Sequence, residues 1–408
     1  MIVKKISLLF FLFISGLQAQ HEIQHEKPRI LLVHSAPWAG GDGVHTFNFF
    51  KMLKEHGYHV DILVAKNGVL QKNLERENYS FFTTPQELLG SWGEHNLERE
   101  AQVITDICTQ NKISIVHCNY RTEVPVILKA AQKTPVKTVF TYHIPYHFDL
   151  NTLKNLTGMI VVDNSFIDYV QENHAQKSLG IKTIESIPPL FNAEKFITYK
   201  SSQEPTKESR KNFFKKTFNI TINNSPIIAV VGNMYRNIEH KNYPLLFQAI
   251  KHLIKTRKKS VQVIIAGDGP SRNTVTQIVK KLNLTKYVYF LGFTDKIPDV
   301  LHHADMVALA SSYEAFGIIF LEAGLMKKPA IGAWGTGAEQ IIVHEKTGLL
   351  FKKDDAHDLS KQIERLIDNK NLAVQLGNNA YDHIINNFLP ALTFARLEKF
   401  YQKILQKN

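Results

Sequence analysis

Two glutamates, Glu314 and Glu322, stand eight positions apart in a segment that could bind one elongated ligand. The segment has the pattern of a strand end (306–310), a polar turn (311–312) and an apolar helix start. One carboxylate would precede the helix, and the other would lie about two turns inside it. The helix N-terminus between them would offer N–H groups and a positive dipole end, which favour a phosphate. Hydroxyl acceptors on both sides of an anion suit a sugar nucleotide, whereas two solvated carboxylates are the structural alternative.

A family resemblance starts from the segments 314–323 (EAFGIIFLEA), 328–330 (KPA) and 335–339 (GTGAE). From about Pro28 onward the chain resembles the retaining nucleotide-sugar glycosyltransferases of family 4, which have the GT-B fold. In that family the first glutamate lies near the donor sugar, the second binds the ribose, and backbone amides after the first hold the diphosphate. The resemblance assigns these roles to Glu314, Glu322 and the three residues Phe316, Gly317 and Ile318.

Short apolar strands alternate with helical stretches in two parts of the chain, which predicts an α/β protein with two doubly wound parallel sheets. The first series of strands is 29–33, 59–64, 113–116, 137–142, 158–162 and 184–187. The second series is 227–231, 261–266, 287–291, 306–310 and 330–333. Each half is Rossmann-like, so we expect the active site in the cleft between the carboxyl ends of the strands, as in the GT-B fold.

A length of 408 residues exceeds one ordinary core and favours two domains. We predict a signal-like or anchor segment with a linker (1–27), an acceptor-side domain (28–197) and a donor-binding domain (225–387). Between the domains, residues 198–224 are polar and basic, and we expect one basic helix at 210–216. The resemblance implies that the last segment, 388–408, is a helix that crosses back to the first domain.

Glycines follow the first strand of the first half at 39–43 (AGGDG), before a predicted helix at 45–56. Glycines allow a backbone to turn tightly and to approach a phosphate. The spacing departs from the dinucleotide-binding fingerprint. The resemblance implies that the loop, represented by Gly41, faces the diphosphate and the acceptor; a plain tight turn is the structural alternative.

The first strand of the second half is followed by 232–242 (GNMYRNIEHKN). The family has a basic residue after the glycine and a lysine several positions later. Lys241 matches that lysine, but Asn233 stands where many relatives have arginine, and Arg236 could supply the missing charge. Two cations would neutralise a departing diphosphate without a metal. A solvated charged loop is the alternative.

His143 closes the predicted strand 137–142, and its place at the carboxyl end of that strand directs it to the cleft. The family has a histidine in this context beside the reacting sugar carbon. His117 is interpreted as a core or lining histidine. The turn at Gly267 and Asp268 lines the nucleotide pocket in the family, so Asp268 is a candidate donor residue, although a structural turn explains it equally well.

The formal net charge is 49 − 37 = +12, which favours anionic donors, anionic acceptors or an acidic membrane face. No basic motif with interleaved aromatics indicates nucleic acid. Cys108 and Cys118 lack metal-ligand spacing, so we expect buried free thiols. The chain has no Asp-x-Asp pair and no zinc-binding pattern, so we predict no metal and no bound cofactor.

Residues 1–20 have two lysines, a short apolar run (6–14) and small residues before a possible cut after Ala19, as in a secretory signal. The run is short for a spanning helix. Export conflicts with a donor that is made in the cytosol. A membrane anchor, an exported form and a downstream start remain open, and the cytoplasmic face of a membrane is favoured.

Together these features predict a retaining, metal-independent glycosyltransferase that acts in glycan, polysaccharide or glycolipid synthesis. Its donor would be a UDP- or GDP-linked sugar, and its acceptor a hydroxyl of a glycan or a lipid-linked sugar. His143 and Glu314 are the catalytic candidates. The donor-binding candidates are Gly41, Arg236, Lys241, Asp268, Phe316, Gly317, Ile318 and Glu322. A GT-B nucleotide-sugar epimerase and a non-catalytic carbohydrate-binding protein are the alternatives.

Overall fold

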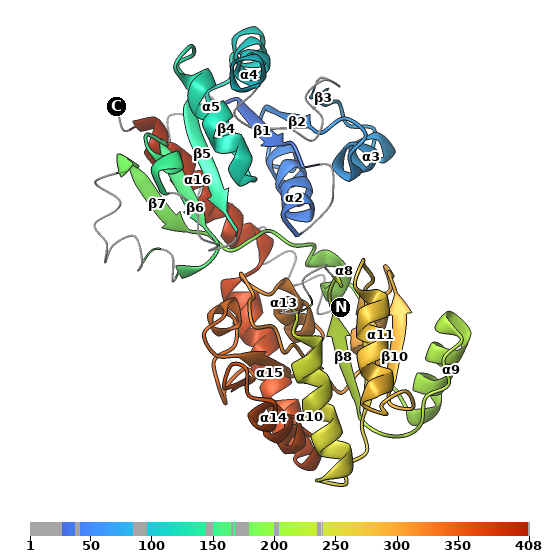
Figure 1. Cartoon of the computed structure of the whole chain (residues 1–408). Coiled ribbons are helices and arrows are strands. Elements are labelled where there is room, and N and C mark those ends of the chain that lie inside the picture. The colour runs from blue at the N-terminus through green and yellow to red at the C-terminus, as the bar shows by residue number, and fades with distance from the viewer. Residues whose placement is uncertain are drawn as a thin grey trace.

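The computed structural model describes residues 27–36, 41–84, 96–143, 150–164, 167, 179–199, 204–234, 238 and 240–406. The chain forms two α/β domains, each built around one sheet, and they lie one above the other in Figure 1. All strand pairs in both sheets are parallel. The predicted α/β architecture with two doubly wound parallel sheets is therefore confirmed. No helix in the described ranges is both long and apolar enough to span a membrane.

The first sheet has seven strands in the order β3-β2-β1-β4-β5-β6-β7. They are β1 (Ile30–His34), β2 (Val60–Val64), β3 (Phe82–Thr83), β4 (Ile115–Cys118), β5 (Lys137–Tyr142), β6 (Gly158–Val161) and β7 (Thr183–Ser186). Its helices are α2 (Gly41–Glu55), α3 (Val69–Arg76), α4 (Leu97–Asn111) and α5 (Val124–Ala131), with short 3₁₀ turns η2 (Arg121–Glu123) and η3 (Leu150–Leu153). Side chains of β1 alternate between two cores: Leu31 and Val33 pack with α4 and α5, and Ile30 and Leu32 pack with α2 and α3.

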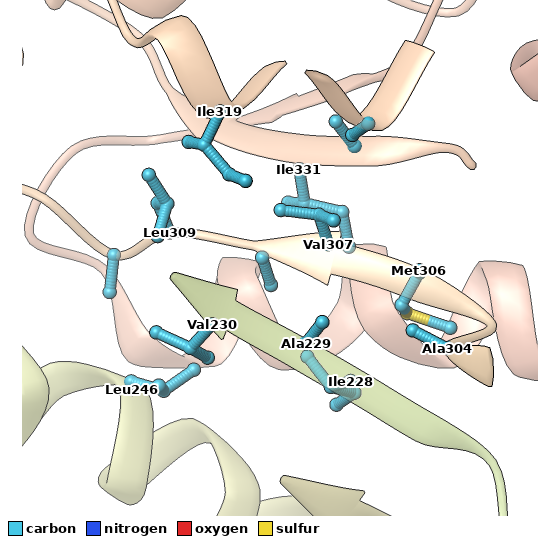
Figure 2. Close-up of a cluster of buried hydrophobic side chains, with 14 of the residues drawn as sticks. Ile228, Ala229, Val230, Leu246, Ala304, Met306, Val307, Leu309, Ile319 and Ile331 are labelled. Atoms are coloured by element: carbon cyan, nitrogen blue, oxygen red, sulfur yellow. The ribbon is translucent and has the colours of Figure 1, made fainter. Parts of the chain in front are cut away.

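The second sheet has six strands in the order β10-β9-β8-β11-β12-β13. They are β8 (Ile227–Val231), β9 (Gln262–Ala266), β10 (Val288–Gly292), β11 (Met306–Ala308), β12 (Ala330–Ala333) and β13 (Leu349–Phe351). Helices α10 (Tyr243–Lys255), α11 (Arg272–Lys281), α12 (Ile297–His303), α13 (Ile318–Leu325), α14 (Ala356–Asp368), α15 (Lys370–Asn387) and the turn η4 (Gly337–Gln340) complete the domain. Figure 2 shows aliphatic side chains of the adjacent strands β8 and β11 meeting those of the neighbouring elements, such as Leu246, Ile319 and Ile331. These apolar strands hold their carboxyl ends in one row, where the polar loops begin.

Every strand that the sequence predicts is present, but β3 and β13 were not predicted. They contain two and three residues, too few for an alternating pattern to be recognised. The first helix begins at Gly41 rather than at His45. Glycine is a poor helix former, so the sequence places Gly41 and Gly43 in a loop, whereas tertiary packing includes them in the first turn.

The last helix, α16 (Pro390–Gln406), packs against the first sheet although the preceding helix belongs to the second domain. Phe394, Phe400 and Tyr401 of α16 belong to the same core as Ile30 and Leu32. A Cβ added at Gly158 of β6 would lie 2.7 Å from Phe400, so a glycine permits this close approach. Figure 1 shows α16 lying along the first sheet.

The connection between the two domains runs through residues 187–197. Leu190 is buried in the core of the first sheet, whereas Phe191 and Phe196 are buried in the core of the second. The short helix α8 (Glu194–Ile197) therefore packs with the second domain, and the chain passes from one core to the other between Leu190 and Phe191.

The basic helix predicted at 210–216 is α9 (Lys207–Phe218), and it is part of the second domain. Thr206 caps its N-terminus by accepting from the N–H of Ser209, and Phe214 is fully buried in the second core. Arg210 donates to both carboxylate oxygens of Asp305, at 2.8 and 2.7 Å. Apolar and ionic contacts thus both fix the helix to the second domain.

Candidate active site

A glycine starts helix α13 at the carboxyl end of the second sheet. Gly317 has φ +90°, and a Cβ placed there would lie 2.5 Å from the ring of Phe320, so other residues would be strained. Gly317 has no side chain that could cap the first N–H groups of the helix. The apolar side chains of Phe316 and Ile319 are buried and anchor the turn. The backbone from Phe316 to Ile318 is therefore held in a conformation that can present N–H groups to an anion.

The left-handed turn at Gly317 lies between the two glutamates. Glu314 lies four residues before α13, and Glu322 is its fifth residue, in the second turn. Glu314 therefore precedes the helix and Glu322 lies inside it, as the sequence pattern predicts. The backbone carbonyl of Glu314 accepts from the N–H of Gly337 at 2.7 Å, which fixes the loop before the helix.

Lys241 and Glu314 form an ion pair at the edge of this turn. The Lys241 ammonium donates to Glu314 Oε2 at 2.6 Å, with only 19% and 15% of the two side chains exposed. The hydroxyl of Ser311 lies 3.4 Å from the same oxygen. A pair that is mostly shielded from water interacts more strongly than one on the surface. The structure therefore fixes one positive and one negative group beside the start of α13.

The floor of the site is a row of glycines where the ends of β8, β9 and β10 meet. The stem of Lys241 passes over Gly232, where an added Cβ would lie 3.2 Å from Cε of the lysine. Gly267 has φ +141°, and a Cβ there would lie 2.0 Å from the carbonyl oxygen of Gly232. The N–H of Gly267 donates to Gly292 at 2.8 Å. The close approach of Gly267 to Gly232 needs glycine, and it brings the backbones of the two strand ends together beside the lysine.

Asp268 follows this floor and is the most open of the candidate donor residues on it. Its side chain is 51% exposed and lies 4.0 Å from Arg272, whose guanidinium stacks over Phe290 at 4.3 Å. Asp268 also accepts from the N–H of Gly269 at 2.8 Å, as in a turn. The carboxylate is thus available at the carboxyl end of β9 while it also stabilises the turn.

Glu322 lies on the side of α13 that faces the connection between the domains. Burial raises the pKa of its carboxyl group to about 7, and the nearby Lys195 of α8 acts in the opposite direction. A protonation equilibrium near neutrality makes this group sensitive to any hydrogen-bond donor that approaches it.

The first domain contributes His143, which follows β5 at the carboxyl edge of the sheet, and Gly41, the first residue of α2. The ring of His143 meets the ring of His45 edge to face, with centroids 4.8 Å apart. His117 is fully buried, as predicted, and its ring nitrogens lie 2.7 Å from the hydroxyl of Tyr401 and 2.6 Å from that of Thr141.

The structure thus joins Lys241 to Glu314 directly and places Phe316, Gly317, Ile318 and Glu322 on the same segment. His143 and Gly41 belong to the other domain, and Arg236 lies outside the described residues. The sequence interpretation missed two histidines. His240 lies beside Lys241 and Glu314, and burial together with the lysine charge lowers its pKa. The second is His45 of α2, whose ring meets that of His143.

Both cysteines are buried and free, as predicted. Across the ranges that the structure describes, no group of three or more histidine, cysteine or acidic side chains could hold a metal ion.

Two family models match the chain, one in each domain. The model described as glycosyl transferases group 1 matches residues 212–383, and the model described as glycosyltransferase family 4 matches residues 39–174. N-acetyl-alpha-D-glucosaminyl L-malate synthase of Bacillus anthracis is 23% identical over 376 residues, which cover 91% of this chain and 96% of the relative. The putative glycosyltransferase EpsD of Bacillus subtilis is 25% identical over 349 residues and covers 81% and 85% of the two chains.

Solved structures share the two-domain arrangement. A glycosyltransferase from Rickettsia africae superposes with a TM-score of 0.79 at 22% identity, covering 94% of this chain and all of that one. Anabaena HepE, in complex with UDP-glucose, superposes with a TM-score of 0.72 at 18% identity and covers 92% of this chain and 100% of its own. At these identities the likeness establishes the fold.

Proposed function

The chain is a glycosyltransferase of family 4 with the GT-B fold, and we propose that it transfers a sugar from a UDP- or GDP-linked donor to an acceptor hydroxyl with retention of configuration. The glycosyltransferase names of the matched families and relatives favour transfer over the epimerase and over the non-catalytic binding protein. HepE has been solved with UDP-glucose, which supports a nucleotide-linked donor here.

The observation that carries the proposal is the position of Lys241. Its ammonium lies 2.6 Å from Glu314, on the glycine floor and beside the N-terminus of α13. In this position it would meet a diphosphate that rests on the N–H groups after Phe316. When the bond between the anomeric carbon and the phosphate oxygen breaks, the electron pair stays on the diphosphate. Lys241 and the helix start would stabilise that growing charge without a metal.

Glu314 would pair with Lys241 in the empty site and with the donor sugar when a donor is bound. In the ligand-free protein its carboxylate neutralises Lys241. A bound donor brings phosphate oxygens to the lysine and sugar hydroxyls to the glutamate, so the two side chains can share the ligand instead of only each other. The pair keeps the site ordered while it is empty, which reduces the cost of reorganisation at the moment of reaction.

Glu322 would bind the ribose from the second turn of the same helix. Hydroxyl groups donate to an ionised carboxylate, so binding of the ribose favours the charged form of Glu322, whose pKa burial raises to about 7 in the empty site. Asp268 and the glycine turn at Gly267 would line the nucleoside, and His143 and Gly41 of the first domain would face the sugar and the acceptor.

The acceptor class proposed here is a glycan or lipid-linked hydroxyl. The Bacillus anthracis relative, by its name, uses malate, a small hydroxy acid. An acceptor panel should therefore contain both sugars and hydroxy acids. We further propose that the protein works at the cytoplasmic face of a membrane. Fractionation with N-terminal sequencing tests this, and a soluble exported form that begins near Gln20 would reject it.

A thermal-shift screen of UDP- and GDP-sugars on protein lacking residues 1–26, followed by transfer assays with the acceptor panel, tests the proposed function. A donor at a hundred times its dissociation constant should stabilise the protein by about 2.7 kcal/mol. A protein that no nucleotide sugar stabilises, and that forms no glycoside with any acceptor, would contradict the proposal.

A further inference from the structure

A buried histidine of helix α2 contacts both the sugar-side histidine and the connection between the domains. His45 is 6% exposed, and its Nδ1 lies 3.3 Å from the backbone nitrogen of Leu190. Its ring meets His143 edge to face at 4.8 Å and stacks on Phe49 at 5.6 Å. One side chain thus contacts the active-site edge, the helix core and the chain segment that leads to the second domain.

The hydrogen bond to Leu190 determines which ring nitrogen of His45 carries the proton. Burial lowers the pKa of His45 to about 3, helped by the neighbouring rings of His117 and His34, so His45 is neutral at neutral pH. A neutral imidazole has one donor and one acceptor. Because Leu190 offers an N–H, Nδ1 of His45 is the acceptor and Nε2 bears the hydrogen.

Leu190 occupies a special place in the chain. It follows Pro188 and Pro189, which have no N–H, so its amide is the first one after Ile187 that can donate. Its side chain is the last to pack in the first core before Phe191 enters the second. His45 therefore holds the chain at the point where the second domain begins.

A cavity of about 10 Å³, lined by Phe49, Thr141, Ile160 and Leu397 among others, lies beside His45. That volume is about what one water molecule needs. The core thus holds a polar ring beside a water-sized void, so His45 is not kept in place by close packing on every side.

We propose that His45 is a positioning residue for the transfer reaction: it fixes the domain connection at Leu190 and supports the ring of His143. The inference rests on the proposed function, in which His143 lies beside the reacting sugar. When the second domain closes over the donor, the first domain must keep its own catalytic edge in place. The buried imidazole of His45 accepts a hydrogen bond from the connection and packs against His143. It therefore holds His143 in a fixed position relative to the domain connection.

Two variants of His45 separate its two contacts. His45→Phe keeps an aromatic ring against His143 but removes the acceptor for Leu190. His45→Asn places an amide oxygen where Nδ1 lies, so it keeps that acceptor but removes the ring. His59→Phe, the same substitution at an exposed histidine of the first domain, is the control.

The first readout is hydrogen exchange of the Leu190 amide, read from peptides that begin at least two residues before Leu190, measured on the full chain without ligand. We expect exchange to be about tenfold faster in His45→Phe than in the wild type, and unchanged in His45→Asn and His59→Phe. Equal protection in all four proteins would overturn the proposed connection. Because no donor is present, this result is independent of whether the protein transfers sugar.

The second readout is steady-state transfer. We expect kcat to fall about tenfold in His45→Phe with donor KM within about twofold of the wild type, and to recover partly in His45→Asn. In a His143→Ala background the His45→Phe effect on kcat should be much smaller, because the two residues act together. Wild-type kcat in His45→Phe, or fully additive effects, would overturn the positioning role while leaving the proposed function intact.

Discussion

The two domains share one architecture but hold their site residues in opposite ways. The second domain uses charge at a half-open edge: Lys241 and Glu314 are paired at 2.6 Å with 19% and 15% of their side chains exposed. The first domain uses histidine rings in a buried layer: His34, His45 and His117 are at most 6% exposed, and His143 extends the layer to the edge. A charged site can respond directly to an anionic ligand, whereas a buried layer can only hold geometry.

The loops after the first strand of each domain also differ in how openly they are built. In the second domain, Gly232 and Gly267 meet backbone to backbone, so the floor allows a ligand to approach closely. In the first domain, Ser35 after β1 donates its N–H and its hydroxyl to the buried carboxylate of Glu123, the hydroxyl at 2.9 Å. We infer that the second domain binds the donor and the first domain provides a rigid edge for the acceptor.

Removal of Lys241 should give the largest effect. Lys241→Ala deletes the cation beside the proposed diphosphate, so kcat should fall about a hundredfold, as for other preorganised electrostatic groups. Transfer assays at saturating donor measure this. Lys346→Ala, which removes an exposed lysine of the same domain, should retain wild-type kcat. If the two variants behaved alike, Lys241 would be only a structural partner of Glu314.

The two glutamates should separate kinetically, with effects of about tenfold each. Glu314→Gln changes the group beside the reacting sugar and should chiefly lower kcat. Glu322→Gln changes the group that binds ribose in both ground and transition states and should chiefly raise the donor KM. Kinetics of both variants with one donor provide the comparison. If both variants only raised KM, or if Glu314→Gln had no effect, the assignment of Glu314 to the sugar and of Glu322 to the ribose would be wrong.

The buried histidines should make the free energy of unfolding depend on pH below neutrality. Burial lowers the pKa of His45 and of His117 to about 3, from 6.5 in the unfolded chain. Between these values the unfolded chain binds protons that the folded chain does not. The free energy of unfolding therefore falls as the pH decreases from 6.5, by about 1.4 kcal/mol per pH unit for each ring.

Urea unfolding between pH 7 and pH 4.5 measures this slope. His117→Gln should reduce it by about one proton, and His59→Gln, at an exposed histidine, should leave it unchanged. Identical slopes for the wild type and His117→Gln would show that His117 is protonated in the folded protein.

Chelation should have the smallest effect. If Lys241 and the start of α13 stabilise the leaving group, transfer should be unchanged by EDTA within about twofold. Initial rates with EDTA, and with EDTA plus excess Mg²⁺ or Mn²⁺, provide the test. Activity that disappears with EDTA and returns with either metal would contradict the proposed leaving-group chemistry.

The sequence predicts the second domain's site more completely than the first, for a physical reason. Lys241 and Gly317 lie in the loops that follow β8 and β11, and Glu322 lies in the helix that follows the second loop, so local patterns identify them. The bend at Gly317 still escaped prediction, since its φ of +90° depends on the packing of Phe320. The role of His45 depends on Leu190, 145 positions away, and on the ring of His143, which follows β5. No local pattern encodes such contacts, so only the folded chain reveals them.

The most direct test of the central claim is the anomeric configuration of the product. The donor that best stabilises the protein, an α-linked nucleotide sugar, is incubated with the acceptor panel, and the new glycosidic proton is read by NMR. The account predicts an α-linked product from wild-type protein and at least about fiftyfold less of it from Lys241→Ala in the same time. A β-linked product, or equal amounts from both proteins, would contradict it.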